Sequence, residues 1–115
     1  MPHRKWDLRI KDILNSIDRI LEYTKNLDFE NFRSDTKTFD AVVRNFEIIG
    51  EVAAQLPEDL SADHPEIPLQ DMRDMRNVLA HEYFGINEKI VWETLQNDFP
   101  PLVPMLKDLL RKQGF

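Results

Sequence analysis

Apolar residues recur at helical spacing along almost the whole chain, and this periodicity limits the fold more than any other feature of the sequence. No stretch of useful length alternates apolar and polar residues as a strand would, and glycine occurs only 3 times. With 115 residues the chain is about one domain long. The pattern predicts a single all-α domain over residues 1–115, an antiparallel up-and-down four-helix bundle with an additional short helix.

The helix boundaries follow from the apolar stripes and from the breaks between them. The expected helices span about residues 7–26, 35–56, 69–84, 87–99 and 101–112. A polar connection is expected over residues 28–35, and the prolines of residues 57–68 indicate a loop with at most one short turn of helix. The last two helices are expected to be separated at Pro100-Pro101.

Local signals mark the junction between the third and fourth of these helices. Gly85 stands where a left-handed residue commonly ends a helix. Asn87 is suited to cap the next helix, with Ile86 and Val91 placed as a hydrophobic staple around it. We therefore expect these two helices to be joined by a short connection.

The composition excludes several classes of protein. The sequence contains no cysteine, which rules out disulfides, thiolate catalysis and cysteine-ligated zinc. No apolar run approaches the roughly 18–20 residues that a membrane span requires, and the charged N-terminus lacks the apolar segment of a secretory signal. We expect a cytoplasmic protein with no membrane partner.

The net charge of −6 argues against a protein that holds nucleic acid by bulk electrostatics. Basic residues do cluster near the N-terminus and in the last expected helix: Arg4, Lys5, Arg9, Lys11, Lys107, Arg111 and Lys112. The simplest interpretation of both clusters is solvated surface charge. Any contact with RNA would therefore have to be local.

The segment over residues 72–85 combines residues that can do chemistry. On an ideal helix its apolar side carries Leu69, Met72, Met75, Val78, Leu79 and Tyr83, its other side carries Arg73, Asn77, Ala80, His81 and Phe84, and Arg76 lies on the boundary. Ala80 and Phe84 suggest that something packs on the second side. One interpretation is purely structural: Arg73 and Arg76 pair with nearby acids such as Asp71 or Asp74, and His81 caps the helix end.

The position of His81 favours a chemical interpretation. His81 lies in the last expected turn, where the negative end of the helix dipole favours imidazolium and raises the pKa of His81 from about 6.5 toward neutrality. A histidine poised near working pH suits general acid–base chemistry. A neighbouring arginine opposes that shift but offers a bidentate clamp for a phosphate.

The motif Arg76-Asn77-x-x-x-His81 resembles that of the HEPN superfamily, in which an arginine and a polar residue precede a histidine. Its continuation His81-Glu82-Tyr83 resembles the HepT-like branch, and the stretch over residues 46–53 is similar to a second part of that family. The resemblance covers most of the chain.

This resemblance implies a function. HepT-like proteins are metal-independent endoribonucleases that dimerise, the toxins of type VII toxin–antitoxin pairs, and a minimal nucleotidyltransferase antitoxin can adenylylate the motif tyrosine. Carried over, Arg76 and His81 would be catalytic, Asn77 and Arg73 would support them, and Tyr83 would be the AMPylation site. The expected partners are RNA rather than DNA, the nucleotidyltransferase and a second copy of the chain. No cofactor or metal is expected.

The chemistry of metal-free RNA cleavage needs a base for the 2′-hydroxyl, an acid for the leaving oxygen and positive charge on the phosphate. One chain offers a single motif histidine, since His3 and His64 are expected to be solvated surface residues. A two-fold dimer, with an interface around Ala80 and Phe84, would supply a second His81.

Tyr83 fits this arrangement less easily. On an ideal helix Tyr83 points about 160° away from His81, so the two side chains share a site only if the helix end unwinds or a partner chain completes the site. Two other functions therefore stay open. The chain could be a catalytically silent HEPN-type dimeric module that holds phosphate, nucleotide or a nucleotidyltransferase, or a plain structural bundle. A di-metal site is disfavoured because the Glu-x-x-His pairs that it requires are absent.

Overall fold

The computed structural model describes the backbone of residues 2–81 and 87–114, and the side chains of residues 6–76 and 87–114. The regular elements of these residues are all helical: α1 (Pro2–Thr24), α2 (Phe29–Ser34), α3 (Thr36–Ala53), α4 (Glu58–Asp63), α5 (Leu69–His81), α6 (Glu88–Glu93), the π-helical turn η1 (Thr94–Asp98) and α7 (Phe99–Lys112). The all-α fold class predicted from the sequence is confirmed. In this part of the chain no helix is both long and apolar enough to cross a membrane.

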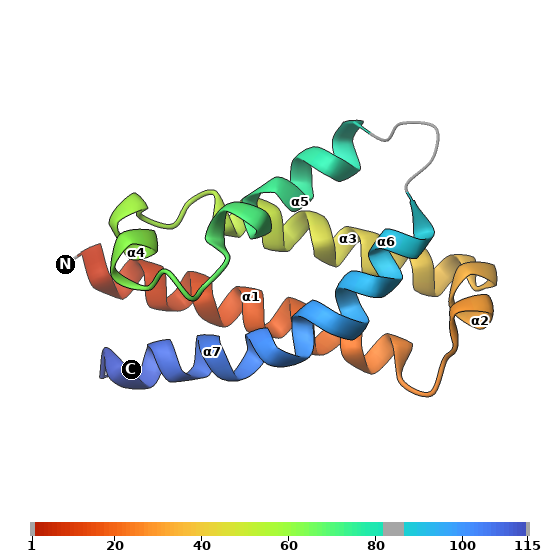
Figure 1. Ribbon diagram of the computed structural model, residues 1–115, viewed down its shortest axis with the longest axis horizontal. Helices are drawn as coiled ribbons and strands as arrows, with labels where there is room; N and C mark the ends of the chain where they lie inside the picture. Colours follow the sequence, from red (N-terminus) through yellow and green to blue (C-terminus); the bar gives the residue numbers. More distant parts are fainter. Residues whose placement is uncertain (1, 82–86, 115) are drawn as a thin grey trace.

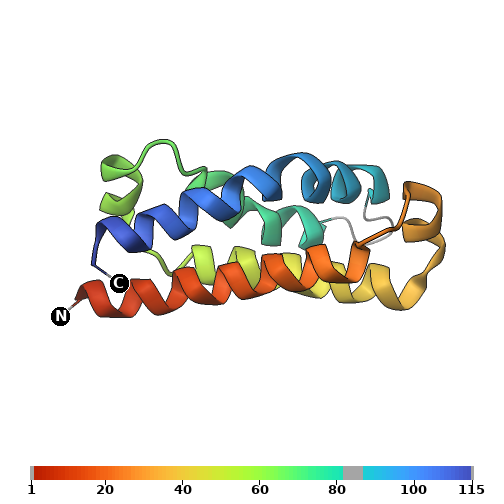
Figure 2. The same cartoon turned by 90° about the horizontal axis from the view of Figure 1, so that it is seen from below.

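The long helices form an antiparallel bundle in which the chain runs up, down, up and down (Figure 1). α1 packs against α3 on one side and α7 on the other, and α5 packs against α3. The view in Figure 2 shows α1 and α7 lying side by side with the two chain ends at the same end of the bundle. α5 rises away from the body of the bundle toward its C-terminal end, so the end of this helix projects from the fold (Figure 1).

The helical stripes predicted from the sequence form the core. Ile10, Ile13 and Ile17 of α1 are completely buried, and Ile49 of α3 and Leu106 of α7 are buried against them. Burying such side chains contributes about 1.5–3 kcal/mol each. The core therefore lies where α1 meets α3 and α7, and α5 adds to it from one edge.

An aromatic corner replaces the polar connection expected over residues 28–35. Asp28 caps α2 by accepting a hydrogen bond from the backbone N–H of Asn31 at 2.8 Å. Phe32 of α2 is fully buried, and its ring centroid lies 5.5 Å from that of Phe39 and 5.1 Å from that of Trp92. Because α2 carries Phe32 into contact with α6, this segment folds as a helix rather than a solvated loop.

The loop expected over residues 57–68 also holds more helix than a single short turn. α4 begins after Pro57, which lacks the N–H that a helix start leaves unpaired anyway. Leu60 of α4 and Ile67 of the following loop are buried, so this segment lies against the bundle.

The helix break expected at Pro100-Pro101 is wrong. The chain stays helical from Glu88 to Lys112, with Pro100 and Pro101 at the start of α7 and Pro104 inside it. The backbone N–H of Phe99 donates to the carbonyl of Thr94, five residues back, which is the wider hydrogen bond of a π turn. α6, η1 and α7 therefore form one continuous helical segment.

The expected cap of the fourth helix is confirmed. The Asn87 side chain accepts hydrogen bonds from the backbone N–H groups of Lys89 at 3.0 Å and Ile90 at 3.1 Å. These bonds satisfy two donors at the start of α6. Gly85 and Ile86, expected to end the preceding helix and to complete the staple, lie outside the described residues.

Candidate active site

The motif identified in the sequence begins in the middle of α5. Leu69 and Met72 are buried and Met75 is partly buried, as the predicted apolar side requires. Arg73 and Arg76 stand apart from this side. Its apolar side thus packs α5 on the bundle, while Arg73 is partly buried and Arg76 is exposed.

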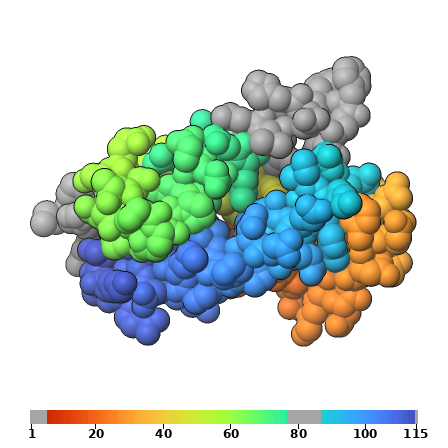
Figure 3. Space-filling view, viewed as in Figure 1, coloured from red at the N-terminus to blue at the C-terminus, as the bar shows by residue number. Residues whose placement is uncertain are grey.

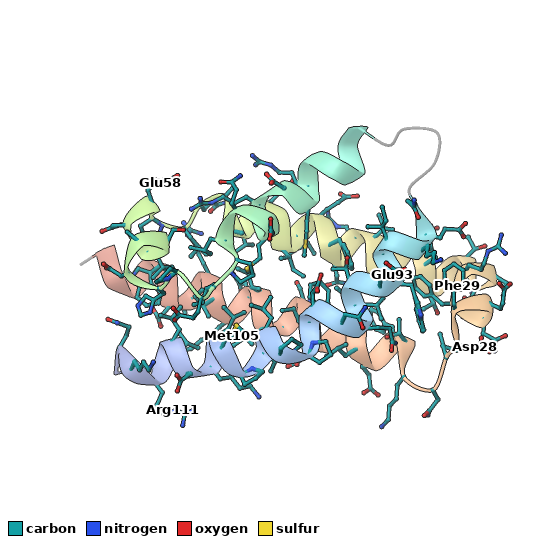
Figure 4. All side chains as sticks on the ribbon, viewed as in Figure 1. Asp28, Phe29, Glu58, Glu93, Met105 and Arg111 are labelled. Atoms are coloured by element: carbon teal, nitrogen blue, oxygen red, sulfur yellow. The ribbon has the colours of Figure 1, made fainter. Side chains whose placement is uncertain are left out.

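Arg73 closes the C-terminal end of α3. Its Nε donates to the carbonyl of Ala53 at 3.1 Å and its Nη2 donates to the carbonyl of Leu56 at 3.2 Å. The Ala53 carbonyl also accepts from the backbone N–H of Leu56 at 3.1 Å, and Leu56 lies just beyond the end of α3, so the guanidinium adds a second donor to one carbonyl and bonds the other directly. Arg73 also lies 3.6 Å from the carboxylate of Glu58, which projects from α4 into solvent (Figure 4).

These contacts bear on the two interpretations of Arg73. Its side chain is only 12% exposed, so most of the guanidinium is committed to protein atoms. The acid that it pairs with is Glu58 rather than Asp71 or Asp74, which the structural interpretation had named. Any support that Arg73 gives to the site would therefore act through the packing of α3 on α5.

Arg76 is placed differently. It is exposed, and among residues 6–76 and 87–114 no acidic side chain forms an ion pair with it. Asp74, the expected candidate, instead accepts a hydrogen bond from the Gln70 side chain at 2.9 Å. As far as the described residues go, the Arg76 guanidinium is therefore left for an external anion such as a phosphate.

The backbone at Arg76 touches α3 at Gly50. A Cβ built on Gly50 would lie 2.6 Å from both the Cβ and the backbone N of Arg76, and 3.1 Å from its Cα. Real Cβ atoms essentially never come closer than 3.0 Å to another heavy atom, so only glycine permits this helix–helix approach. Gly50 is the site-related residue that sequence reasoning missed, although a glycine inside an expected helix is a signal of close packing.

The remaining motif residues are described in part or not at all. The backbone of Asn77 and of His81 belongs to α5. Their side chains, and Ala80, Tyr83 and Phe84, lie outside the described residues. The expected grouping of these residues, the expected interface and the angle between His81 and Tyr83 stay predictions.

His64 does not match its expected role as a solvated residue. Its side chain is 15% exposed, and its Nδ1 lies 3.6 Å from the carboxylate of Glu66. Its backbone N–H donates to the carbonyl of Leu60 at the end of α4. The burial of Leu60 and Ile67 on either side holds the loop of His64 against the bundle. His3 lies outside the residues whose side chains are described.

A hollow of about 250 Å³ separates the first half of α5 from α7. The elements that meet along this face are shown in Figure 3, and Met105 on its α7 side is labelled in Figure 4. The walls are mostly apolar and are formed by Met72, Met75, Phe99, Leu102 and Met105. Three acidic side chains also line the hollow: Glu66, Asp71 and Asp98. Negative charge disfavours an RNA phosphate here, so the hollow is not the substrate site that the motif predicts.

No three His, Asp or Glu side chains are grouped so as to hold a metal ion within the part of the chain that the structure describes.

The pKa of Asp35 is held below its ordinary value by hydrogen bonds from the side chain and backbone of Thr38. Asp35 caps the start of α3, at the opposite end of that helix from Gly50.

Comparison with known proteins adds an independent finding. The family described as Ribonuclease HepT-like matches residues 13–109. A relative from Thermococcus cleftensis, named a probable ribonuclease HepT, is 43% identical over 93 residues, which cover 81% of this chain and 84% of the relative. A Methanocaldococcus jannaschii protein that carries the name "Putative RNase MJ0125" is 35% identical over 116 residues, covering 97% of this chain and 100% of that protein. No solved structure matches the chain.

Proposed function

Because the chain belongs to the HepT-like ribonuclease family, we propose that it is the toxin of a type VII toxin–antitoxin pair and cuts RNA without a metal ion. One observation carries the proposal: α5 presents Arg76 as an exposed guanidinium with no acidic partner in the described residues, on the same helix as His81. Exposure alone does not distinguish Arg76, since Arg19 of α1 is also exposed; what distinguishes Arg76 is that it shares α5 and the motif with His81, whereas Arg73 is bonded to protein atoms.

The proposed reaction is an internal transesterification. A base takes the proton of a ribose 2′-hydroxyl, the 2′-oxygen forms a bond to the adjacent phosphorus, and the bond from phosphorus to the 5′-oxygen breaks. An acid gives a proton to the departing 5′-oxygen, which leaves a cyclic phosphate on one product and a hydroxyl on the other. Arg76 stabilises the extra negative charge on the phosphate oxygens. Because DNA lacks the 2′-hydroxyl, the substrate is RNA.

The acid and the base are two copies of His81 in a homodimer. One chain supplies a single motif histidine, and His64 is tied to Glu66 within its own loop. The projecting end of α5 (Figure 1) supports this arrangement, because a helix end that stands away from the bundle can meet its counterpart across a two-fold axis. Asn77 supports the pair from the adjacent position on the helix.

The test is cleavage of a single-stranded RNA in the presence of EDTA. Wild type should cut the RNA and leave a cyclic or 2′/3′-phosphate end, and Arg76→Ala and His81→Ala should each reduce kcat by about 100-fold or more. Arg44→Ala is the matched control, because Arg44 is also an exposed arginine on a long helix and lies outside the motif. Full activity in either motif variant, or strict dependence on Mg²⁺, contradicts the proposal.

The alternative function gives a different result in the same experiment. A catalytically silent binding module would retain RNA or nucleotide without cutting it, and Arg76→Ala would weaken that retention. Fluorescence anisotropy with a labelled RNA measures the retention directly.

Control of the toxin is proposed to act through Tyr83. A minimal nucleotidyltransferase would attach AMP to the Tyr83 hydroxyl, adding one negative charge and the bulk of a nucleotide near the Arg76 side of the helix. Co-expression with such an enzyme followed by intact-mass measurement should show added AMP on wild type and none on Tyr83→Phe. Tyr23 is the control, because its side chain is 43% exposed on α1 and it lies outside the motif. AMP lost in Tyr23→Phe but retained in Tyr83→Phe refutes the assignment.

A further inference from the structure

Gly50 and Arg76 form a very close approach between α3 and α5. The absent side chain of Gly50 leaves room for the backbone N and Cβ of Arg76, each of which would lie 2.6 Å from an added Cβ. This contact fixes how far α5 stands from α3 at the residue that begins the motif.

Arg73 fixes the position of α5 along the length of α3. Its guanidinium bonds the carbonyls of Ala53 and Leu56, at the C-terminal end of α3, so α5 cannot slide along α3 without breaking these bonds. Arg73 precedes Arg76 by about one helical turn, and Ala53 follows Gly50 by the same interval in the antiparallel partner. Register and separation are therefore both set within one turn of Arg76.

We infer that Gly50 is a positioning residue for Arg76: its missing side chain lets α5 lie close enough to α3 for the guanidinium to reach the scissile phosphate. The inference rests on the proposed ribonuclease function. Gly50 itself touches no substrate, and it acts only by placing the Arg76 backbone. Arg73 is the second positioning residue, and it acts by holding the register.

The size of the effect follows from the contact distances. Carbon atoms in contact lie about 3.5–4.0 Å apart, so a methyl group on Gly50 must push the Arg76 backbone outward by about 1 Å. A misplacement of about 1 Å in a catalytic group can reduce a rate by about 100-fold. We therefore expect Gly50→Ala to lower kcat by about 10- to 100-fold, with a smaller change in KM, because binding of a long RNA depends on many contacts besides this one.

The experiment compares Gly50→Ala with Ile17→Val, which removes one methyl group from the core on α1 and leaves the Gly50–Arg76 contact as it is. RNA cleavage is measured at saturating substrate, well below the melting temperature of each variant. A ¹⁵N correlation spectrum of each variant reports where the structure has moved. Gly50→Ala should shift the Arg76 amide signal and leave that of Leu106 on α7 in place, and it should lose far more kcat than Ile17→Val at equal loss of stability.

Arg73→Gln provides a second route if Gly50→Ala does not fold. It removes the clamp on α3, that is, the two hydrogen bonds from the Arg73 guanidinium to the carbonyls of Ala53 and Leu56, without adding volume. It should also lower kcat, while Arg44→Gln should not. Wild-type kcat in a folded Gly50→Ala protein, or a loss no larger than that of Ile17→Val, overturns the inference and leaves the proposed function standing. Wild-type protein that cuts no RNA overturns the proposed function, and the positioning role falls with it.

Discussion

Replacing Arg73 by alanine tests how much the clamp on α3 contributes to the fold. The substitution removes two hydrogen bonds from a charged donor, at 3.1 and 3.2 Å, and leaves the carbonyls of Ala53 and Leu56 without that partner. Each hydrogen bond of this kind contributes about 1.5–3 kcal/mol. The ion pair with Glu58 adds at most about 1 kcal/mol, because the Glu58 side chain is 91% exposed and water screens the pair.

The two hydrogen bonds share one side chain, so their contributions do not add fully. We expect Arg73→Ala to lower the free energy of unfolding by about 2–4 kcal/mol, a large part of the roughly 5–15 kcal/mol of a typical domain. Arg73→Lys should fall between wild type and alanine, because lysine keeps the charge but not the planar fork that reaches both carbonyls.

Urea denaturation followed by circular dichroism measures the change, provided that the slope of the transition is the same in all variants. Arg44→Ala is the control, since the Arg44 side chain is 67% exposed and pairs with Glu47 on the same helix at 3.6 Å. That variant should stay within about 0.5 kcal/mol of wild type. If Arg73→Ala unfolds at the same urea concentration as Arg44→Ala, the clamp does not stabilise the fold and the argument is refuted.

Three further substitutions test other parts of the structure. Phe32→Ala should cost about 3–5 kcal/mol in urea denaturation because the ring is fully buried between Phe39 and Trp92, and a change below about 1 kcal/mol would mean that the aromatic corner is not packed. Asn87→Ala should cost about 0.5–2 kcal/mol in the same assay by removing the cap of α6, and an unchanged midpoint would contradict that role. Asp35→Ala should lower the melting temperature at neutral pH. The pKa of Asp35 is lowered in the folded state, so its stabilisation is complete above the ordinary pKa of 3.8 and is lost as the pH falls through the lower folded value. The melting temperatures of wild type and Asp35→Ala should therefore converge only in acid below that range, and convergence near pH 6 would show another cause.

The features predicted correctly from the sequence are those that a single helix determines. The buried faces of α1 and α3 follow from spacing alone, because a stripe such as Ile10, Ile13 and Ile17 repeats with the helical period. The Asn87 cap is local in the same way, since donor and acceptor lie within three residues.

The features that the sequence did not predict depend on distant partners. Phe32 is buried because Trp92 covers it, and nothing near Phe32 in the sequence announces that partner. Arg73 reaches carbonyls 17 and 20 residues away, so its capping role required the packing of α5 on α3. The need for a glycine at position 50 likewise becomes apparent only when the backbone of Arg76 is seen to pack against it.

The π turn has a consequence for the lengths that this chain tolerates. Val91, Leu95 and Phe99 are buried at intervals of four residues, which a wide turn aligns better than an ordinary α-helical turn does. Deleting one residue between Thr94 and Asp98 would give a regular helix with little rotation of α6 relative to α7, because the five residues of the π turn cover about the same angle as four α-helical residues. Trp92 would then still face α2 while Leu102 stayed in the core. A relative with one residue fewer in this turn could therefore keep the same aromatic corner.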